Sequence, residues 1–304
     1  MSSQQLADQF KPIVYFHPRE LHFPVNVETY LASCDVLDQK DGTIILAGPL
    51  SSTIMNTNKG SIPDGATLKV MESKEEEIKS GIAVANINSV PFYCRINQTT
   101  EFIYLTYVFV YGYNWNYPVF FNLFPTGEHW SDFEHVTMEL DATTTELKRV
   151  YYGAHRQADG KWLNAADVKM TSGRVTVYSS RGSHGCYYNE SFYLRVGGFA
   201  NDTVGSLTSW IADSVLLVYD DTEPEFVATS MGFLTFNGTW GNGKVTGMQR
   251  KFFWNAPETG GQSSAPWASP INILTEWFIV AIVASIVIAL SIWGIVESTK
   301  PKSG

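Results

Sequence analysis

The chain has 304 residues, of which 44% are hydrophobic and 14% aromatic, so it can bury a sizeable core in one large or two ordinary domains. Its 21 basic and 30 acidic residues give a net charge of −9 and form no Lys/Arg cluster, which argues against nucleic acid as a partner because phosphate binding needs a basic surface. The 3 Cys are widely separated and lack a CxxC pair, which suits a reducing compartment or a fold that does not depend on disulfides.

The first third of the chain predicts short elements separated by polar turns. Residues 13–16 are β-branched and aromatic and predict a strand that ends at Pro18. Residues 26–37 predict a short helix, for which Asn26 is a suitable N-cap. A strand, a loop and a solvated charged surface are expected over residues 42–50, 51–70 and 72–79.

The middle of the chain predicts a β-rich core. Residues 101–113 are nearly all β-branched or aromatic and predict a central strand. Further strands are expected over residues 82–96, 134–141, 147–154, 174–180 and 211–219. Many short strands with Gly, Pro and Asn turns between them favour an antiparallel β-sandwich with few short helices, extending over residues 1–254.

One short stretch around Asp132 holds the densest group of acidic and imidazole side chains in the sequence. In a strand that begins near Asp132, alternation places Asp132 and Glu134 on the face of Val136, which is normally the buried one. Buried carboxylates need a partner, and a divalent cation such as Mg or Ca is suitable because hard cations prefer oxygen ligands. His129 lies just before the strand and can complete the site. The alternative is that these are solvated charges at a strand end or that they pair with Arg.

Two later imidazoles, His155 and His184, each follow a strand-like run. Both are candidates for the same site, either as lining residues or as the general base of a metal-dependent hydrolase. Taken separately, each is more often a hydrogen-bonded core or turn residue. Further candidates for lining a ligand site are Glu128, His135, Arg181 and Trp115. Trp115 lies in an aromatic loop that can stack on a sugar or a lipid headgroup, or can simply pack at the end of a sandwich.

Several short motifs occur in the order found in a known family. They are YFHPRE at residues 15–20, DFEHV at 132–136, His155, SRGSH at 180–184 and GTWG at 238–241. Together they resemble the vacuolar protein sorting-associated protein 62 family over roughly residues 10–260. The resemblance implies no particular reaction.

A more distant resemblance is to the necrosis- and ethylene-inducing peptide-like cytolysins, whose hallmark is Gly-His-Arg-His-Asp-Trp-Glu on a β-sandwich. When the hallmark is aligned here, its first His, its Asp and its Glu fall on His129, Asp132 and Glu134. Those positions ligate a divalent cation in the cytolysins, so the resemblance implies the same ligands here. The additional acidic ligand of the cytolysins lies upstream, where only Asn122 or Glu128 occurs, so Asn122 is a further candidate ligand.

The C-terminal part of the chain has the composition of a linker followed by a membrane anchor. Residues 255–270 are rich in Pro, Gly, Ser and Ala and predict a linker. From Trp277 to Val296 about 20 residues carry no charge, which is long enough for a helix to cross the bilayer core. We therefore expect a transmembrane helix within residues 271–297, in contact with the lipid bilayer, and a short polar tail over residues 298–304.

The direction of insertion has two opposite indications. Lys300 and Lys302 follow the span, and the positive-inside rule alone places this tail in the cytosol and the domain outside. The first residues lack the charged-then-apolar pattern of a signal peptide, however, which favours a single-pass tail anchor with the soluble domain in the cytosol. The Asn-x-Ser/Thr sequons are then chance occurrences; they lie at Asn97, Asn189, Asn201 and Asn237.

Three functions follow from these observations. The first is a membrane-anchored module that binds a divalent cation and, through it, a polar lipid or sugar headgroup, in membrane trafficking. The second is a metal-dependent hydrolase that uses the same His/Asp/Glu cluster. The third is a structural membrane protein or adaptor, of trafficking or of a virion, in which these residues only stabilise the fold. Folding that is independent of metal favours the third, and no protein partner is indicated.

Overall fold

The computed structural model divides the chain into two compact units, Met1–Ala265 and Pro266–Gly304. It describes residues 1–63, 65–115, 117–119, 124–126, 128–154, 160–195, 200–220, 233, 236, 238–241 and 285. The predicted linker, transmembrane helix and tail lie outside these residues, apart from Ser285. Among the residues described, no helix has both the length and the apolar character needed to cross a membrane.

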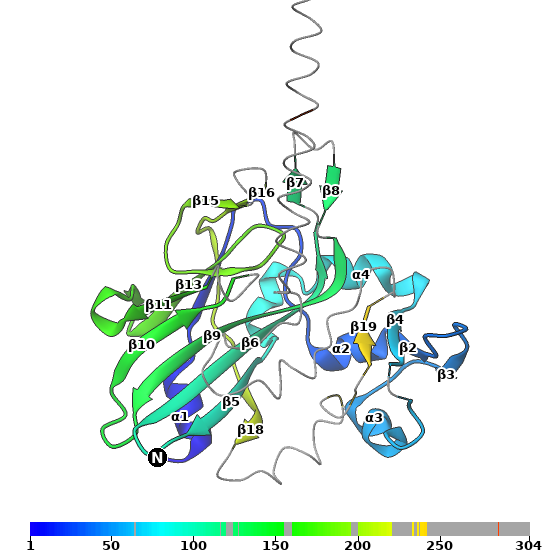
Figure 1. Ribbon diagram of the computed structural model, residues 1–304, viewed down its shortest axis with the longest axis horizontal. Helices are drawn as coiled ribbons and strands as arrows, with labels where there is room; N and C mark the ends of the chain where they lie inside the picture. The colour runs from blue at the N-terminus through cyan, green and yellow to red at the C-terminus, as the bar shows by residue number, and fades with distance from the viewer. Residues whose placement is uncertain are drawn as a thin grey trace, which may run out of the picture. The chain divides into compact units, whose positions relative to one another are not determined.

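The fold of the first unit is mainly β, as predicted, and is built around a six-stranded sheet (Figure 1). In spatial order the strands are β11 (Lys161–Asn164), β10 (Leu147–Tyr152), β9 (His129–Asp141), β6 (Phe102–Asn114), β5 (Phe92–Gln98) and β18 (Val215–Asp220). β6 confirms the predicted central strand, because it pairs antiparallel with β5 on one side and with β9 on the other. β9 and β10 form the expected hairpin.

A second sheet packs against one face of the first. Its strands are β12 (Met170–Thr171), β13 (Arg174–Ser179), β1 (Ile13–Phe16) and β17 (Thr208–Trp210), with β14 (Cys186–Tyr187) added to β13. The largest apolar cluster combines residues of both sheets, so it lies between them. Trp210 is fully buried there against Phe16, Phe92 and Phe109, and its indole nitrogen donates to the Val90 carbonyl at 3.1 Å.

The other face of the six-stranded sheet is partly covered by a small sheet and short helices. The small sheet runs β19 (Thr239–Trp240), β4 (Thr67–Val70), β2 (Cys34–Leu37) and β3 (Ile44–Leu46). A second apolar cluster joins it and helix α2 to Val108 and Val110 of β6 and to Phe133 of β9. The α-helices are α1 (Ser3–Phe10), α2 (Val27–Ala32), α3 (Ser52–Asn58) and α4 (Glu75–Ser80). Two ribbons complete the unit: β7 (Tyr117–Val119) with β8 (Phe124–Thr126), and β15 (Phe192–Arg195) with β16 (Ala200–Thr203).

Three strand pairings correct the expectation of an antiparallel sandwich. β1 with β13, β5 with β18 and β4 with β19 run parallel. Each pair joins segments that are far apart in the sequence. The alternation of side chains along a strand shows which face is buried, but it carries no information about the direction of a distant partner. The sheets are therefore mixed.

Two predictions in the first third of the chain are corrected as well. The helix predicted over residues 26–37 begins after the Asn26 N-cap, as expected, but it ends at Ala32 and is followed by strand β2. The loop predicted over residues 51–70 contains α3 and β4. Both β2 and β4 contribute to the second apolar cluster, so packing of the small sheet outweighs local propensity in these segments.

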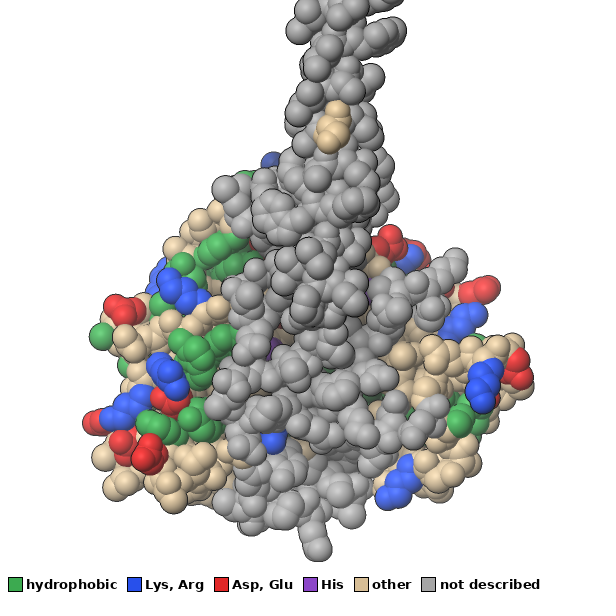
Figure 2. All heavy atoms as spheres, viewed as in Figure 1, with side chains coloured by type: hydrophobic (Ala, Val, Ile, Leu, Met, Phe, Trp, Pro, Cys, Tyr) green, Lys and Arg blue, Asp and Glu red, His purple; other side chains and the backbone are tan. Residues whose placement is uncertain are grey.

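The surface seen in Figure 2 carries charge of both signs. Described Lys and Arg side chains lie among Asp and Glu side chains at the margins of this face, with apolar side chains between them. The β9–β10 hairpin shows the same mixture, since Lys148 Nζ lies 3.5 Å from Asp141 and 3.2 Å from Glu146. Exposed pairs of this kind contribute little to stability, so the fold depends on its apolar clusters and its buried polar contacts.

His135 of β9 lies on the face of the sheet opposite to Val136. Its ring stacks on Tyr151 with 5.9 Å between the ring centroids. The backbone of Gly153 passes so close that a Cβ there would lie 2.7 Å from the ring. Burial disfavours the charged imidazolium and lowers the pKa of His135 from 6.5 to about 4.

We expect His135 to make the free energy of unfolding fall in acid. In the unfolded chain the imidazole takes up its proton near pH 6.5, whereas in the folded chain it does so only near pH 4. The stability contributed by the neutral ring is therefore complete above pH 6.5 and is lost as the pH falls toward 4, by about 3 kcal/mol in all. Urea unfolding of Met1–Ala265 measures this effect. The His135→Gln variant lacks the titration, so its stability should approach that of the wild type on acidification, and parallel curves would contradict the assignment.

Candidate functional site

Two carboxylates of β9, Asp132 and Glu134, lie on the face that carries Val136, as alternation predicts. Asp132 is opposite Tyr111 and Glu134 is opposite Phe109 on β6. Their exposed fractions are 2% and 8%. Both side chains are therefore buried on the side of the sheet that faces the main core, where each carboxylate needs hydrogen bonds or a counter-charge.

His129 is held at the start of β9 by the backbone around Ser131. The strand begins at His129, three residues before the expected start, and Ser131 within it adopts a left-handed conformation with φ of 53°. The Ser131 hydroxyl donates to the Trp240 carbonyl at 3.1 Å, and His129 Nδ1 donates to the Ser131 carbonyl at 3.0 Å. Because a left-handed residue interrupts the alternation, the position of His129 does not follow from its parity with Asp132.

The expected metal ligands do not form a set of three in the structure. Within the ranges described, no three His, Cys, Asp or Glu side chains gather closely enough to hold a metal ion. Asn122, the additional candidate ligand, and His155, a candidate general base, lie outside the described residues. Of the expected ligands, Asp132 and Glu134 share the buried face of β9, and His129 lies at the start of that strand.

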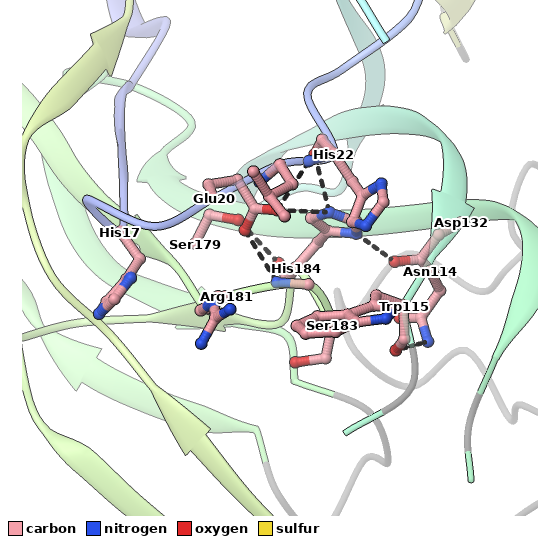
Figure 3. A network of polar contacts seen from close by, with 12 residues as sticks. His17, Glu20, His22, Asn114, Trp115, Asp132, Ser179, Arg181, Ser183 and His184 are labelled. Carbon is pink, nitrogen blue, oxygen red and sulfur yellow. Dashed lines mark hydrogen bonds and ion pairs between the residues drawn. The ribbon is translucent and has the colours of Figure 1, made fainter. Parts of the chain in front are cut away.

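His184 is the partner of Asp132. Its Nδ1 lies 3.0 Å from Asp132 Oδ2, and its Nε2 donates to the His22 carbonyl at 3.0 Å (Figure 3). The imidazole is fully buried and stacks on Tyr111 with 3.8 Å between the centroids and 4° between the planes. The residue has a φ of 55°, a left-handed conformation that is uncommon outside glycine.

Both ring nitrogens of His184 are engaged by the protein. A carbonyl oxygen can only accept, so Nε2 carries a proton toward His22, and on the other side Nδ1 and Asp132 share one proton. Neither nitrogen has a lone pair free for a substrate in this arrangement. The candidate general base His184 therefore orients Asp132 instead.

Glu20 is a buried member of the same network that the sequence alone does not single out. It is 6% exposed, and its Oε1 lies 3.9 Å from His184 Nε2. That oxygen accepts from the backbone nitrogens of Leu21 and His22, both at 2.9 Å, and Oε2 accepts from the Gly182 nitrogen at 2.8 Å. Glu20 thus ties the loop after β1 to the loop after β13. Its one sequence signal is its place in the YFHPRE motif.

A further buried network supports the His184 loop from behind. The Ser183 hydroxyl donates to Asp202 Oδ1 at 2.6 Å, and the Tyr187 hydroxyl donates to Asp202 Oδ2 at 2.5 Å. The hydroxyls of Ser180 and Ser183 lie 2.8 Å apart. Asp202 itself is 1% exposed. These contacts fix both ends of the tight turn that carries His184.

The Cys186 thiol and the Tyr111 hydroxyl are buried near Asp132 and Glu134, and both groups stay protonated. Burial raises the pKa of the Cys186 thiol, and the charges of Glu134 and Asp132 raise it further. Burial also raises the pKa of Tyr111, with Cys186, Asp132 and Glu134 acting in the same direction. Neither group is therefore poised as a nucleophile.

Trp115 and Arg181 form part of the rim of this site. The Trp115 backbone nitrogen donates to the Gly182 carbonyl at 2.9 Å, which holds the aromatic loop against the His184 turn. The guanidinium of Arg181 lies over the Trp115 ring, 5.1 Å from its centroid. Both side chains are partly exposed.

Glu128 lies on another part of the rim. It accepts a hydrogen bond from the Tyr113 hydroxyl, and burial together with this carboxylate raises the pKa of Tyr113. The ammonium of Lys79 lies 5.6 Å from the Tyr113 ring and 5.3 Å from the Trp130 ring. His135, by contrast, is on the opposite face of the sheet, so it does not join Asp132 and Glu134.

Comparisons with known proteins agree with the motifs. The family model of vacuolar protein sorting-associated protein 62 matches residues 2–230. No curated protein matches the chain. Among solved structures, Necrosis and Ethylene inducing Protein 2 from the causal agent of cocoa's Witches Broom disease is 14% identical, with 71% of this chain and 74% of that one covered and a TM-score of 0.36.

Two further solved structures belong to the same class. NLPPya in complex with mannosamine is 12% identical, with coverage of 70% and 72% and a TM-score of 0.35. The non-toxic HaNLP3 protein is 10% identical, with coverage of 77% and 80% and a TM-score of 0.38. The family match extends over most of the chain and contains every site residue described above except Trp240. The chain therefore belongs to the vacuolar protein sorting-associated protein 62 family.

Proposed function

We propose that the chain is a membrane-anchored binding module of membrane trafficking. It holds a divalent cation, Mg or Ca, at Asp132 and Glu134 and binds a polar lipid or sugar headgroup beside it. The observation that carries the proposal is the burial of both carboxylates on one face of β9, next to a rim of aromatic and charged side chains. The family to which the chain belongs is named for vacuolar sorting, which supports a role in trafficking.

Asp132 and Glu134 fit a hard cation because carboxylate oxygens are its preferred ligands. When bound, the cation supplies positive charge beside two buried carboxylates and a point of attraction for an oxygen-rich headgroup. His184 orients the Asp132 carboxylate for the cation, because its Nδ1 lies 3.0 Å from Asp132 Oδ2. Carboxylates that bind metals are commonly oriented by such a hydrogen bond. The Nδ1 of His129 is bonded to the Ser131 carbonyl.

The partly exposed rim is the surface proposed for the headgroup. Trp115 with Arg181 and Trp130 with Lys79 each combine an aromatic ring with a cation. A flat ring can contact the apolar face of a sugar, while the neighbouring cation and Glu128 bind its polar groups. These side chains come from the loop after β6, the turn after β13, strand β9 and helix α4, so their spacing depends on the fold that brings these segments together.

A role in stabilising the fold, called the bracing role, is the second candidate, because hydrogen bonds of Glu20 and His184 join two loops to strand β9. In that account the carboxylates bind no cation and serve only the fold. A hydrolase has less support, since both nitrogens of His184 are engaged by the protein. Measuring cation binding separates the two candidates.

We expect the full chain in neutral detergent to bind Ca or Mg, as measured by isothermal titration calorimetry. Asp132→Asn and Glu134→Gln should each weaken this binding by about tenfold or more, because each variant loses a charge–cation interaction worth at least about 1.4 kcal/mol. The control is Glu146→Gln in the β9–β10 turn, where the side chain is 70% exposed. It removes the same charge and should leave binding unchanged. A wild-type chain that binds neither cation, with chelator-independent melting, would favour the bracing role.

The membrane part of the proposal rests on the uncharged stretch from Trp277 to Val296. The cytosolic location of the domain rests on the tail-anchored arrangement, because the sequons do not decide it: Asn97 is 4% exposed in β5, whereas Asn189 is exposed.

For this anchor we expect the full chain to stay with the membrane fraction after a carbonate wash, whereas Met1–Ala265 should be released. In sealed microsomes an added protease should digest the domain, because a tail anchor leaves it on the cytosolic side. Release of the full chain by carbonate would rule out the anchor, and protection of the domain would reverse the proposed orientation.

A further inference from the structure

Arg181, Arg19 and His17 lie beside the buried network, in the two loops that Glu20 joins. Arg181 is the most constrained member of this cluster. Its backbone nitrogen donates to the Thr203 carbonyl at 3.0 Å, its Nε donates to the Arg19 carbonyl at 3.1 Å, and its guanidinium rests on Trp115. Over the described part of the chain, the two terminal nitrogens of this guanidinium make no hydrogen bond and no ion pair. The guanidinium is thus held in place, and its two terminal nitrogens are available to donate hydrogen bonds to a ligand.

His17 extends the cluster. Its Nδ1 accepts from the Arg19 backbone nitrogen at 3.0 Å, so the neutral ring carries its proton on Nε2 and can donate there. The ring packs against Gly205, where a Cβ would lie 3.2 Å from His17 Cδ2. Burial lowers the pKa of His17 and the charge of Arg181 lowers it further, whereas the carboxylate of Glu20 raises it and Arg19 again lowers it. The ring therefore lies within range of two guanidinium charges and of one carboxylate, Glu20.

Glu20 is the carboxylate whose charge acts on His17 in this cluster. The carboxylate of Glu20 is turned inward and accepts three backbone hydrogen bonds. Among the residues that the structure describes, neither Arg19 nor Arg181 forms an ion pair with an Asp or Glu. This is unexpected in a chain with 30 acidic and 21 basic residues. Glu20 thus balances only part of the positive charge that Arg181 and Arg19 place around the neutral His17 ring, and an external anion would balance the rest.

We propose that Arg181, His17 and Arg19 form an anion subsite that binds a phosphoryl or sulfo group of the ligand. Figure 3 shows the side chains of Arg181 and His17 pointing the same way, away from the contacts of His184. A fixed guanidinium binds two oxygens of such a group through parallel N–H donors, and the imidazole supplies a further donor. The subsite rests on the proposed function, because it specifies the anionic part of the same headgroup.

Two exposed leucines next to the cluster bear on the source of the phosphoryl group. Leu21 is 61% exposed and lies two residues after Arg19. Leu207 is 70% exposed, and its backbone nitrogen donates to the carbonyl of Phe16, which directly precedes His17. Exposed leucines beside cations suit the boundary between a lipid headgroup and its acyl chains. A soluble phosphate ester would use the cations alone.

Calorimetric titration of the full chain in neutral detergent tests the subsite with two probes that share one phosphate: glycerol 3-phosphate and dihexanoyl phosphatidic acid. We expect the wild type to bind at least one of them and Arg181→Gln to bind it about tenfold more weakly or worse. Arg181→Lys should fall between, since it keeps the charge and loses the parallel N–H donors. Lys40→Gln, which removes one exposed charge in the β2–β3 turn, should bind as the wild type does.

The relative affinities for the two probes identify the source of the phosphoryl group. Equal affinities would assign a soluble phosphate ester. Tighter binding of the lipid, weakened by Leu207→Ser, would assign a lipid headgroup. Either result supports the subsite. If Arg181→Gln does not fold, His17→Gln provides the second variant and should weaken binding of the same probe.

The subsite is overturned if the wild type binds neither probe, or if Lys40→Gln and Arg181→Gln lose affinity equally. Calcium titration of the same samples distinguishes failure of the anion subsite from failure of the proposed cation binding. Loss of phosphate binding with calcium binding retained would overturn the subsite alone. Phosphate binding that persists in a chain without calcium binding would overturn only the cation proposal.

Discussion

Placing an imidazole and two carboxylates between apolar sheets costs several kcal/mol unless each group finds a hydrogen-bonded partner, and this constraint organises one end of the molecule. Glu20, His184 and Asp132 come from three separate segments, and each depends on contacts from the others. The network can form only when the loop after β1, the start of β9 and the turn after β13 are in place together. The rim side chains are carried by these same segments.

The backbone supports this view of the network. His184 and Ser131 both adopt left-handed conformations without being glycine, with φ of 55° and 53°. Such conformations cost of order 1 kcal/mol or more and persist where the surroundings demand them. Glycine at position 184 would relieve the backbone but would remove the ring that holds Asp132. The identity of the side chain therefore matters more here than the preference of the backbone, as is common at functional sites.

Local patterns were enough to predict part of the site. The period of two along β9 places Asp132 and Glu134 on the buried face, because that rule needs only neighbouring residues. It fails for His129, since left-handed Ser131 interrupts the alternation. It also separates His135 from the pair, although the four residues are close in sequence.

The other partners could not be predicted from local patterns. No spacing rule links Glu20 to Gly182 or His184 to Asp132, because these contacts exist only once β1 pairs with β13 and both pack on β9. The parallel pairings of β1, β18 and β19 depend on the same long-range assembly. The ordered family motifs supplied what local rules could not, since they mark Glu20, Asp132 and His184 as parts of one pattern.

The central claim is the proposal that a buried His–carboxylate network positions Asp132 and Glu134 to bind a divalent cation. A crystal structure of the full chain grown with manganese, a hard divalent cation with a strong anomalous signal, tests it most directly. The account predicts an anomalous peak in contact with both carboxylates, with His184 still bonded to Asp132. Crystals at saturating manganese with the network intact and no peak at these carboxylates would contradict it.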